Sequence, residues 1–129
     1  MTSTYIMRVV CEFAAAHHLR GYAGDCNRLH GHNWRVEAEI AAHELDSVGM
    51  GMDFREIRGH LRAIAGRLDH RHLNEVAPFD VYNPTAENIA RHFFRELAER
   101  LDTPGIRVHA VSVWENDRAS VRYTEQKEA

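Results

Sequence analysis

Alternating apolar and polar positions predict two strands in the first third of the chain. In residues 5–14, Arg8 and Glu12 share one parity. The apolar side chains of that segment share the other parity: Met7, Val9, Cys11 and Phe13. Residues 33–42 alternate in the same way, with these apolar side chains: Trp34, Val36, Ala38 and Ile40. Glycine, asparagine and aspartate between the two segments indicate a loop, so we expect two strands that each have one buried face.

Helical spacing replaces this alternation in the middle of the chain. Apolar residues recur at three- and four-residue intervals from Phe54 onward and again after Thr85. Asp53 precedes the first of these segments, and Glu56 follows it at the spacing of a capping box. Thr85 is the expected N-cap of the second segment. We therefore predict two amphipathic helices.

Residues 106–116 and 120–125 have the pattern of two further strands joined by a short polar turn. The order strand–strand–helix–helix–strand–strand predicts an α+β fold, with a four-stranded antiparallel sheet and two helices on one face. The length fits a single domain over residues 1–129. Such a sheet has open edges that need cover, so we expect the subunits to assemble into a ring.

The composition narrows the class of protein. The net charge of −3 and the absence of a basic run argue against a nucleic-acid partner. No apolar stretch approaches the ~20 residues that span a bilayer, and the first residues lack the pattern of a signal peptide. Two cysteines are too few for a disulfide framework, so we expect a cytoplasmic protein. The ten histidines are the unusual feature.

Two histidines begin the second strand with the spacing His30-Gly31-His32. Residues two apart in an extended chain point to the same side, so both imidazoles can reach one metal ion. The preceding strand ends with the adjacent pair His17 and His18, of which only one can face these imidazoles. Spacing alone does not decide which. Three imidazoles with a fourth position open are typical of a catalytic zinc site, although three histidines suit several divalent ions.

Cys26 lies in the loop four residues before His30. It is either a fourth metal ligand, which would make the site closed and structural, or a reactive thiol beside an open position. It can also be an ordinary loop residue. Cys11 has the parity of the buried face and is predicted to lie in the core.

Three further candidates come later in the chain. Asp69 and His70 are adjacent, and a carboxylate beside an imidazole can fix its tautomer and raise its basicity. His70 and His72 form a second His-x-His motif, but we expect a helical turn there, on which residues two apart diverge. Glu115, near the end of the third long strand, could accept two hydrogen bonds from the edge of a heterocycle.

Together these motifs resemble the 6-pyruvoyl-tetrahydropterin synthase family. The segments that carry the resemblance occur in the family's order and spacing: "FAAAHHL", "CNRLHGHNW", "MDF", "LDHRHLNE", "NPTAENIA" and "VSVWEN". The resemblance extends from about Tyr5 to Tyr123 and implies the tunnelling fold. It also implies trimeric barrels that stack into homohexamers, with active sites at subunit interfaces.

The resemblance assigns roles to individual residues. The implied zinc ligands are His17, His30 and His32, and His17 is preferred over His18 because the family's motif is framed by Phe13 and Leu19. The implied catalytic residues are Cys26, Asp69 and His70. The implied substrate-binding residues are Glu115, which would anchor the pterin, and Thr85.

The short spacing between Cys26 and His30 resembles the bacterial subgroup that makes 6-carboxy-tetrahydropterin for queuosine biosynthesis. The implied reaction converts 7,8-dihydroneopterin triphosphate to that product, acetaldehyde and triphosphate. Arg20 and Arg28 are near enough in the sequence to receive the triphosphate. One alternative is the pyruvoyl synthase reaction, which eliminates triphosphate without carbon–carbon cleavage. Another is a non-enzymatic zinc scaffold in which Cys26 is the fourth ligand.

Overall fold

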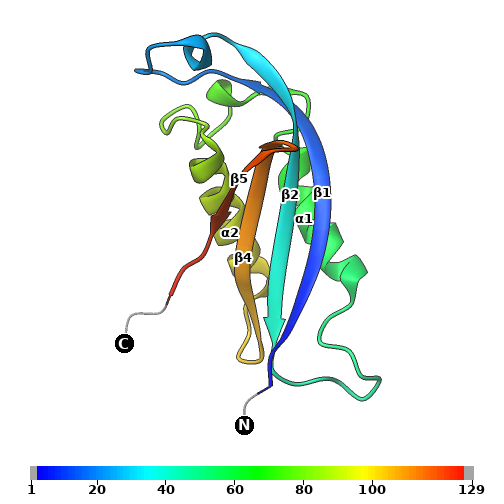
Figure 1. Ribbon diagram of the computed structural model, residues 1–129. Helices are drawn as coiled ribbons and strands as arrows, with labels where there is room; N and C mark the ends of the chain where they lie inside the picture. Colours follow the sequence, from blue (N-terminus) through cyan, green and yellow to red (C-terminus); the bar gives the residue numbers. More distant parts are fainter. Residues whose placement is uncertain (1–2, 127–129) are drawn as a thin grey trace.

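The computed structural model describes residues 3–126. It shows a five-stranded sheet that two helices cover on one face. The strands are β1 (Tyr5–His17), β2 (His30–Ala42), β3 (Arg71–His72), β4 (Ile106–Asn116) and β5 (Ala119–Tyr123). The helices are α1 (Phe54–Gly66) and α2 (Ala86–Leu101), with short 3-10 turns η1 (Asp25–Asn27) and η2 (Leu73–Glu75). Figure 1 shows both helices on the same side of the sheet. The predicted α+β class is confirmed.

The sheet has the order β3-β1-β2-β4-β5. The pairs β1–β2, β2–β4 and β4–β5 are antiparallel, which confirms the four predicted strands. The fifth strand corrects the prediction of a helical turn at Arg71 and His72. These residues are extended and pair in parallel with Ala15 and Ala16. Two residues are too few to carry a periodic pattern, so only the pairing with β1 defines this strand.

Both helices begin at the predicted caps. The Asp53 side chain accepts a hydrogen bond from the backbone N–H of Arg55 at 2.8 Å. The Thr85 hydroxyl accepts one from the backbone N–H of Asn88 at 3.1 Å. Each bond satisfies a donor that the first helical turn leaves free. Thr85 therefore fixes where α2 starts and, with it, the position of Pro84.

The core lies between the sheet and the two helices. Phe13 of β1 stacks against Trp34 of β2 and Phe93 of α2, with ring centroids 6.2 and 5.9 Å apart. Cys11 is buried on the same face of β1, as predicted. Along residues 3–126, no helix combines the length and apolar character needed to cross a membrane. The predicted domain of residues 1–129 includes two residues at its start and three at its end that lie outside the described part of the chain.

Candidate metal and catalytic site

Three histidines meet where the β1–β2 hairpin opens into its long loop. His17 is the last residue of β1 and pairs directly with His30, the first residue of β2. His32 lies two residues further along β2, so its side chain leaves the strand on the same face as that of His30. This face is the one that carries Trp34 and the core. The strand pairing thus brings together residues that are 13 apart in the sequence.

The donor atoms of these side chains converge. His17 Nε2 lies 3.0 Å from His30 Nε2. Glu115 Oε1, from β4, lies 3.4 Å from His17 Nε2 and 3.5 Å from His32 Nε2. One ligand atom from each of the four residues lies within 4.8 Å of all the others. Three nitrogens and one carboxylate oxygen therefore surround a space of the size that a single metal ion needs.

Backbone carbonyls orient two of the rings. His17 Nδ1 lies 2.7 Å from the carbonyl oxygen of Pro84, and His30 Nδ1 lies 2.7 Å from that of Arg28. Because a carbonyl oxygen only accepts, each Nδ1 must carry the proton and donate it. This tautomer leaves the Nε2 lone pairs directed at the shared space, as in metal sites whose ligands are held by second hydrogen bonds.

Burial keeps the histidines in the form that binds metal. It lowers the pKa of His17 and that of His32 below the ordinary histidine value, because the charged imidazolium loses hydration. A neutral imidazole is the form that coordinates a cation. His32 Nε2 is buried and has no hydrogen-bond partner among residues 3–126. A buried polar nitrogen left without a partner is costly in a protein alone, and a metal ion would satisfy it.

Trp34 forms the floor of the site, a role that the sequence prediction did not assign. Its ring lies edge-to-face with those of His17 and His32, at centroid distances of 4.9 and 5.2 Å. Its indole N–H donates to the carbonyl oxygen of Ala15 at 3.2 Å. The alternation along β2 could have predicted this contact, since Trp34 lies on the same side of the strand as both histidines.

The residues present fit a zinc ion. Imidazole nitrogens and a carboxylate oxygen are ordinary zinc ligands, and the same donors suit other divalent first-row metals. The fit rests on the oriented Nε2 atoms and on the partnerless nitrogen of His32. His18 is not a member of this cluster in residues 3–126.

Asp69 and His70 form a second polar unit at the edge of the sheet. Asp69 Oδ2 lies 3.0 Å from His70 Nδ1, and Asp69 Oδ1 accepts the backbone N–H of Ala14 at 2.9 Å. The Ala14 N–H and the His70 ring both lower the pKa of the Asp69 carboxyl below its usual value. The carboxylate holds the proton on His70 Nδ1. Because the His70 side chain is 82% exposed, its Nε2 is accessible for proton exchange.

The backbone fixes this pair in an unusual conformation. His70 has a φ of 57°, in the left-handed region that few residues other than glycine adopt. Its N–H donates to the carbonyl oxygen of Ala14 at 2.6 Å. Such a conformation persists where the surrounding structure determines it, and it is enriched at functional sites.

The Asp69–His70 pair opens mainly onto the face of the sheet opposite to the histidine cluster. The pair borders a hollow of about 450 Å³ whose walls include Asn33, Arg35 and Trp114. These residues have the parity opposite to that of the core, so the hollow lies on the face away from the helices. His70 also shares the rim of a second, open hollow with His32. Within the part of the chain that the structure describes, His70 is not among the four residues whose ligand atoms converge.

Cys26 lies in η1, in the loop that follows β1, and its side chain is exposed. Its carbonyl oxygen accepts the N–H of Leu19 at 2.8 Å, which closes the base of the loop. Cys26 does not belong to the metal-type cluster of residues 3–126. Arg28 is exposed in the same loop, whereas the Arg20 guanidinium donates to the carbonyl oxygen of Phe79 at 2.9 Å.

Its solved structural neighbours place this α+β chain, with two helices on one face of the sheet, in the tunnelling-fold class. A solved structure of 6-pyruvoyl tetrahydropterin synthase from Caenorhabditis elegans superposes with a TM-score of 0.85 at 25% identity, over 97% of this chain and 98% of that one. The enzyme of the same name from Plasmodium falciparum shares the fold. It superposes with a TM-score of 0.74 at 19% identity, over 95% of this chain and 98% of that one.

The family model of 6-pyruvoyl tetrahydropterin synthase matches residues 6–126, and the chain belongs to this family. A Synechocystis protein named 6-carboxy-5,6,7,8-tetrahydropterin synthase is 37% identical over 117 residues, which cover 87% of each chain. An Archaeoglobus fulgidus relative is 36% identical over 117 residues, which cover 91% of this chain and 93% of its own. The family resemblance of the sequence motifs is confirmed.

Proposed function

We propose that this protein is a zinc-dependent 6-carboxy-5,6,7,8-tetrahydropterin synthase. It converts 7,8-dihydroneopterin triphosphate to 6-carboxy-tetrahydropterin, acetaldehyde and triphosphate, and so acts as a carbon–carbon lyase in queuosine biosynthesis. The membership of the chain in a pterin synthase family and the names of its relatives support this proposal. The observation that carries it is the convergence of three Nε2 atoms, two of them oriented by carbonyl oxygens.

The ligands of the zinc ion are His17, His30 and His32. Zinc, when bound there, supplies a Lewis acid that polarises oxygen atoms of the substrate side chain. The neutral histidines hold their Nε2 lone pairs toward one point, and Trp34 excludes water from beneath them.

Two side chains carry out the proton transfers. Cys26, as a thiolate, takes a proton from the substrate side chain. His70 exchanges a second proton through Nε2, while Asp69 keeps its other ring nitrogen protonated. General acid or base groups contribute about 10²–10⁴-fold each, so removal of either side chain abolishes useful turnover.

Glu115 anchors the pterin ring in this proposal, with Thr85 as a weaker contact. A carboxylate can accept two parallel hydrogen bonds from the N–H edge of a pyrimidine. The position of Glu115 Oε1 beside two of the histidines favours a second role, that of fourth metal ligand. These roles predict different defects.

Glu115→Gln separates the two roles of this side chain. If it anchors the pterin, the variant keeps its zinc content and loses substrate affinity, because the amide presents a donor where the ring also donates. If it is a ligand, zinc content falls as well. Atomic absorption on the dialysed variant, beside the KM for the pterin triphosphate, distinguishes them, and Glu37→Gln on β2 is the matched control.

Product analysis tests the reaction. Zinc-loaded protein incubated with 7,8-dihydroneopterin triphosphate should release 6-carboxy-tetrahydropterin and acetaldehyde, which mass spectrometry identifies. 6-Pyruvoyl-tetrahydropterin without acetaldehyde would assign the chain to the other reaction of the family. The short Cys26–His30 spacing favours the first outcome. Zinc binding without turnover of this substrate would overturn both reactions and favour the scaffold alternative.

The working form is a cytoplasmic homohexamer of two stacked trimers. The open edge of β1 supports this assembly. The strand β3 pairs only with Ala15 and Ala16, so residues 5–13 have no paired strand on that side within residues 3–126. An unpaired edge of this length invites pairing with another chain. The proposed partners are thus further copies of this chain and a small pterin, with no nucleic acid and no membrane.

A further inference from the structure

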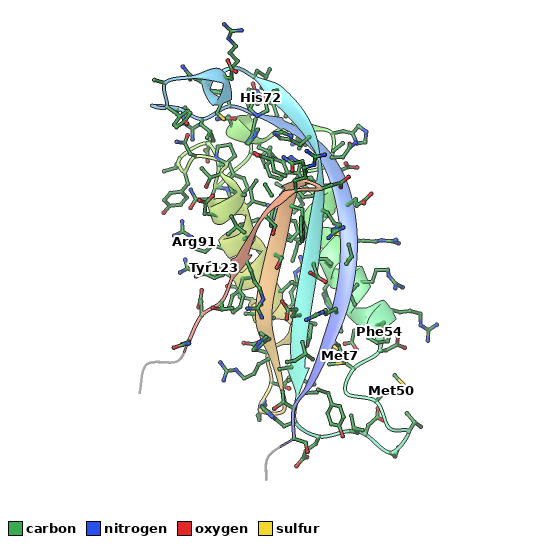
Figure 2. The ribbon with its side chains drawn as sticks, in the orientation of Figure 1. Met7, Met50, Phe54, His72, Arg91 and Tyr123 are labelled. Carbon is green, nitrogen blue, oxygen red and sulfur yellow. The ribbon has the colours of Figure 1, made fainter. Side chains whose placement is uncertain are left out.

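Two histidines outside the zinc cluster also face each other. His18 follows the last residue of β1, and His72 ends β3. His72 Nε2 lies 3.4 Å from His18 Nδ1, and the two ring centroids are 5.5 Å apart. Figure 2 labels His72 at the upper end of the molecule in that view. The proposed reaction uses neither side chain.

The separation of the two nitrogens suits a shared metal ion. Zn–N bonds of about 2.0–2.1 Å at a tetrahedral angle place two donor nitrogens roughly 3.3 Å apart. An N–H···O or N–H···N hydrogen bond is shorter, with a usual range of about 2.7–3.2 Å. The observed 3.4 Å is therefore long for a hydrogen bond between the rings and close to the metal-bridged distance.

The backbone around both residues is fixed before any ion binds. The buried Asn74 accepts the backbone N–H of His18 at 3.0 Å and donates to its carbonyl oxygen at 2.9 Å. His72 is held by the parallel pairing of β3 with Ala16. Little conformational freedom remains to be lost when an ion bridges the two rings, which favours binding.

Glu75 contacts the other ring nitrogen of His72. Its Oε1 lies 3.5 Å from His72 Nδ1, on the side of the ring opposite to the nitrogen that faces His18. At this distance the carboxylate acts on the ring by charge attraction rather than through a hydrogen bond. Its negative charge favours the tautomer with the proton on Nδ1, which leaves the Nε2 lone pair free. The side chain of His72 is 28% exposed, so water can supply the remaining ligands of an ion.

We propose that His18 and His72 form a second binding site for a divalent transition-metal ion, oriented by Glu75 and completed by water. The site is separate from the zinc cluster, since within residues 3–126 neither His18 nor His72 is among the four residues whose ligand atoms converge there. A bound ion ties the end of β1 to the segment that directly follows His70. The proposal does not depend on the reaction assigned above.

Metal stoichiometry tests this site. The full-length protein is dialysed against buffered Zn²⁺, and bound metal per chain is measured by inductively coupled plasma mass spectrometry. The wild type should hold a second equivalent that His72→Gln and His18→Gln lose. His60→Gln, on α1, is the matched control and should keep both equivalents. His30→Gln should lose the first equivalent and keep the second.

A variant with a partial effect distinguishes loss of the metal site from loss of the fold. Glu75→Gln changes a side chain that is 77% exposed and should weaken the second ion about 10–100-fold without altering the stoichiometry at saturation. Circular dichroism of each variant in chelator should match the wild type. A wild type that saturates at one equivalent, or a second equivalent that survives in His72→Gln, would overturn the proposal.

Discussion

At the scale of single residues, hydrogen bonds to main-chain carbonyls decide which ring nitrogen of a histidine is available. Pro84 and Arg28 supply the carbonyls for His17 and His30. Neither acceptor could be inferred from residue type, since any residue has a carbonyl oxygen. The choice of His17 over His18 rested on the family motif, and the burial of His17 agrees with it.

The two cysteines should differ in reactivity. Cys26 is exposed and outside the metal-type cluster, so iodoacetamide should modify it in both zinc-loaded and zinc-free protein. Cys11 should stay unmodified in the native state, because it is buried and burial raises its pKa to about 11. Mass mapping of the modified peptides measures both. Protection of Cys26 by zinc alone would instead make it a ligand and support a closed structural site.

At the scale of elements, the periodic segments were predictable and the irregular ones were not. The alternating pattern supports the first strand only as far as about Ala14, whereas the expected metal site requires it to reach His17, and β1 does continue to His17. Ala14–Ala16 have no alternation and favour helix by propensity, and pairing with residues 31–33 of β2 overrides that preference. This extension is what places His17 opposite His30.

Thr85→Ala should destabilise the protein by about 1 kcal/mol, because the first turn of α2 loses its side-chain cap. Thermal unfolding of the zinc-free protein should show a melting temperature lower by about 3–6 °C. Thr85→Ser keeps the hydroxyl and is the control, with a melting temperature near that of the wild type. Equal losses in the two variants would mean that the methyl group, not the cap, matters.

At the scale of the whole molecule, the two groups of residues proposed to act in the reaction open mainly onto different faces of the sheet. The histidine cluster faces the helix side of the sheet, whereas Asp69 and His70 border a hollow on the other side. Figure 1 shows the long β1–β2 loop extending beyond the body of the sheet and helices, at the end opposite to both termini. An assembly of several chains can bring the loop of one subunit to the Asp69–His70 pair of another.

Mixed oligomers test this sharing. Cys26→Ala and His70→Ala should each be inactive, and oligomers co-assembled from both should regain activity, because some sites then combine an intact Cys26 with an intact His70. Turnover per chain after refolding the mixture measures the recovery. Cys26→Ala mixed with His30→Gln is the control without recovery, since in this arrangement each site takes its loop and its histidine cluster from one subunit. Failure of the first mixture to recover would place all the groups of one site on a single chain.

The sequence by itself determined the long strands, both helices with their caps, and the set of candidate residues, because these depend on local periodicity and on residue type. Only the tertiary structure decided which candidates meet. Strand pairing joined His17 to His30, the β2–β4 contact added Glu115, and β3 brought His72 to His18. Contacts between residues far apart in the chain depend on register and on packing against the core, and no local pattern encodes either.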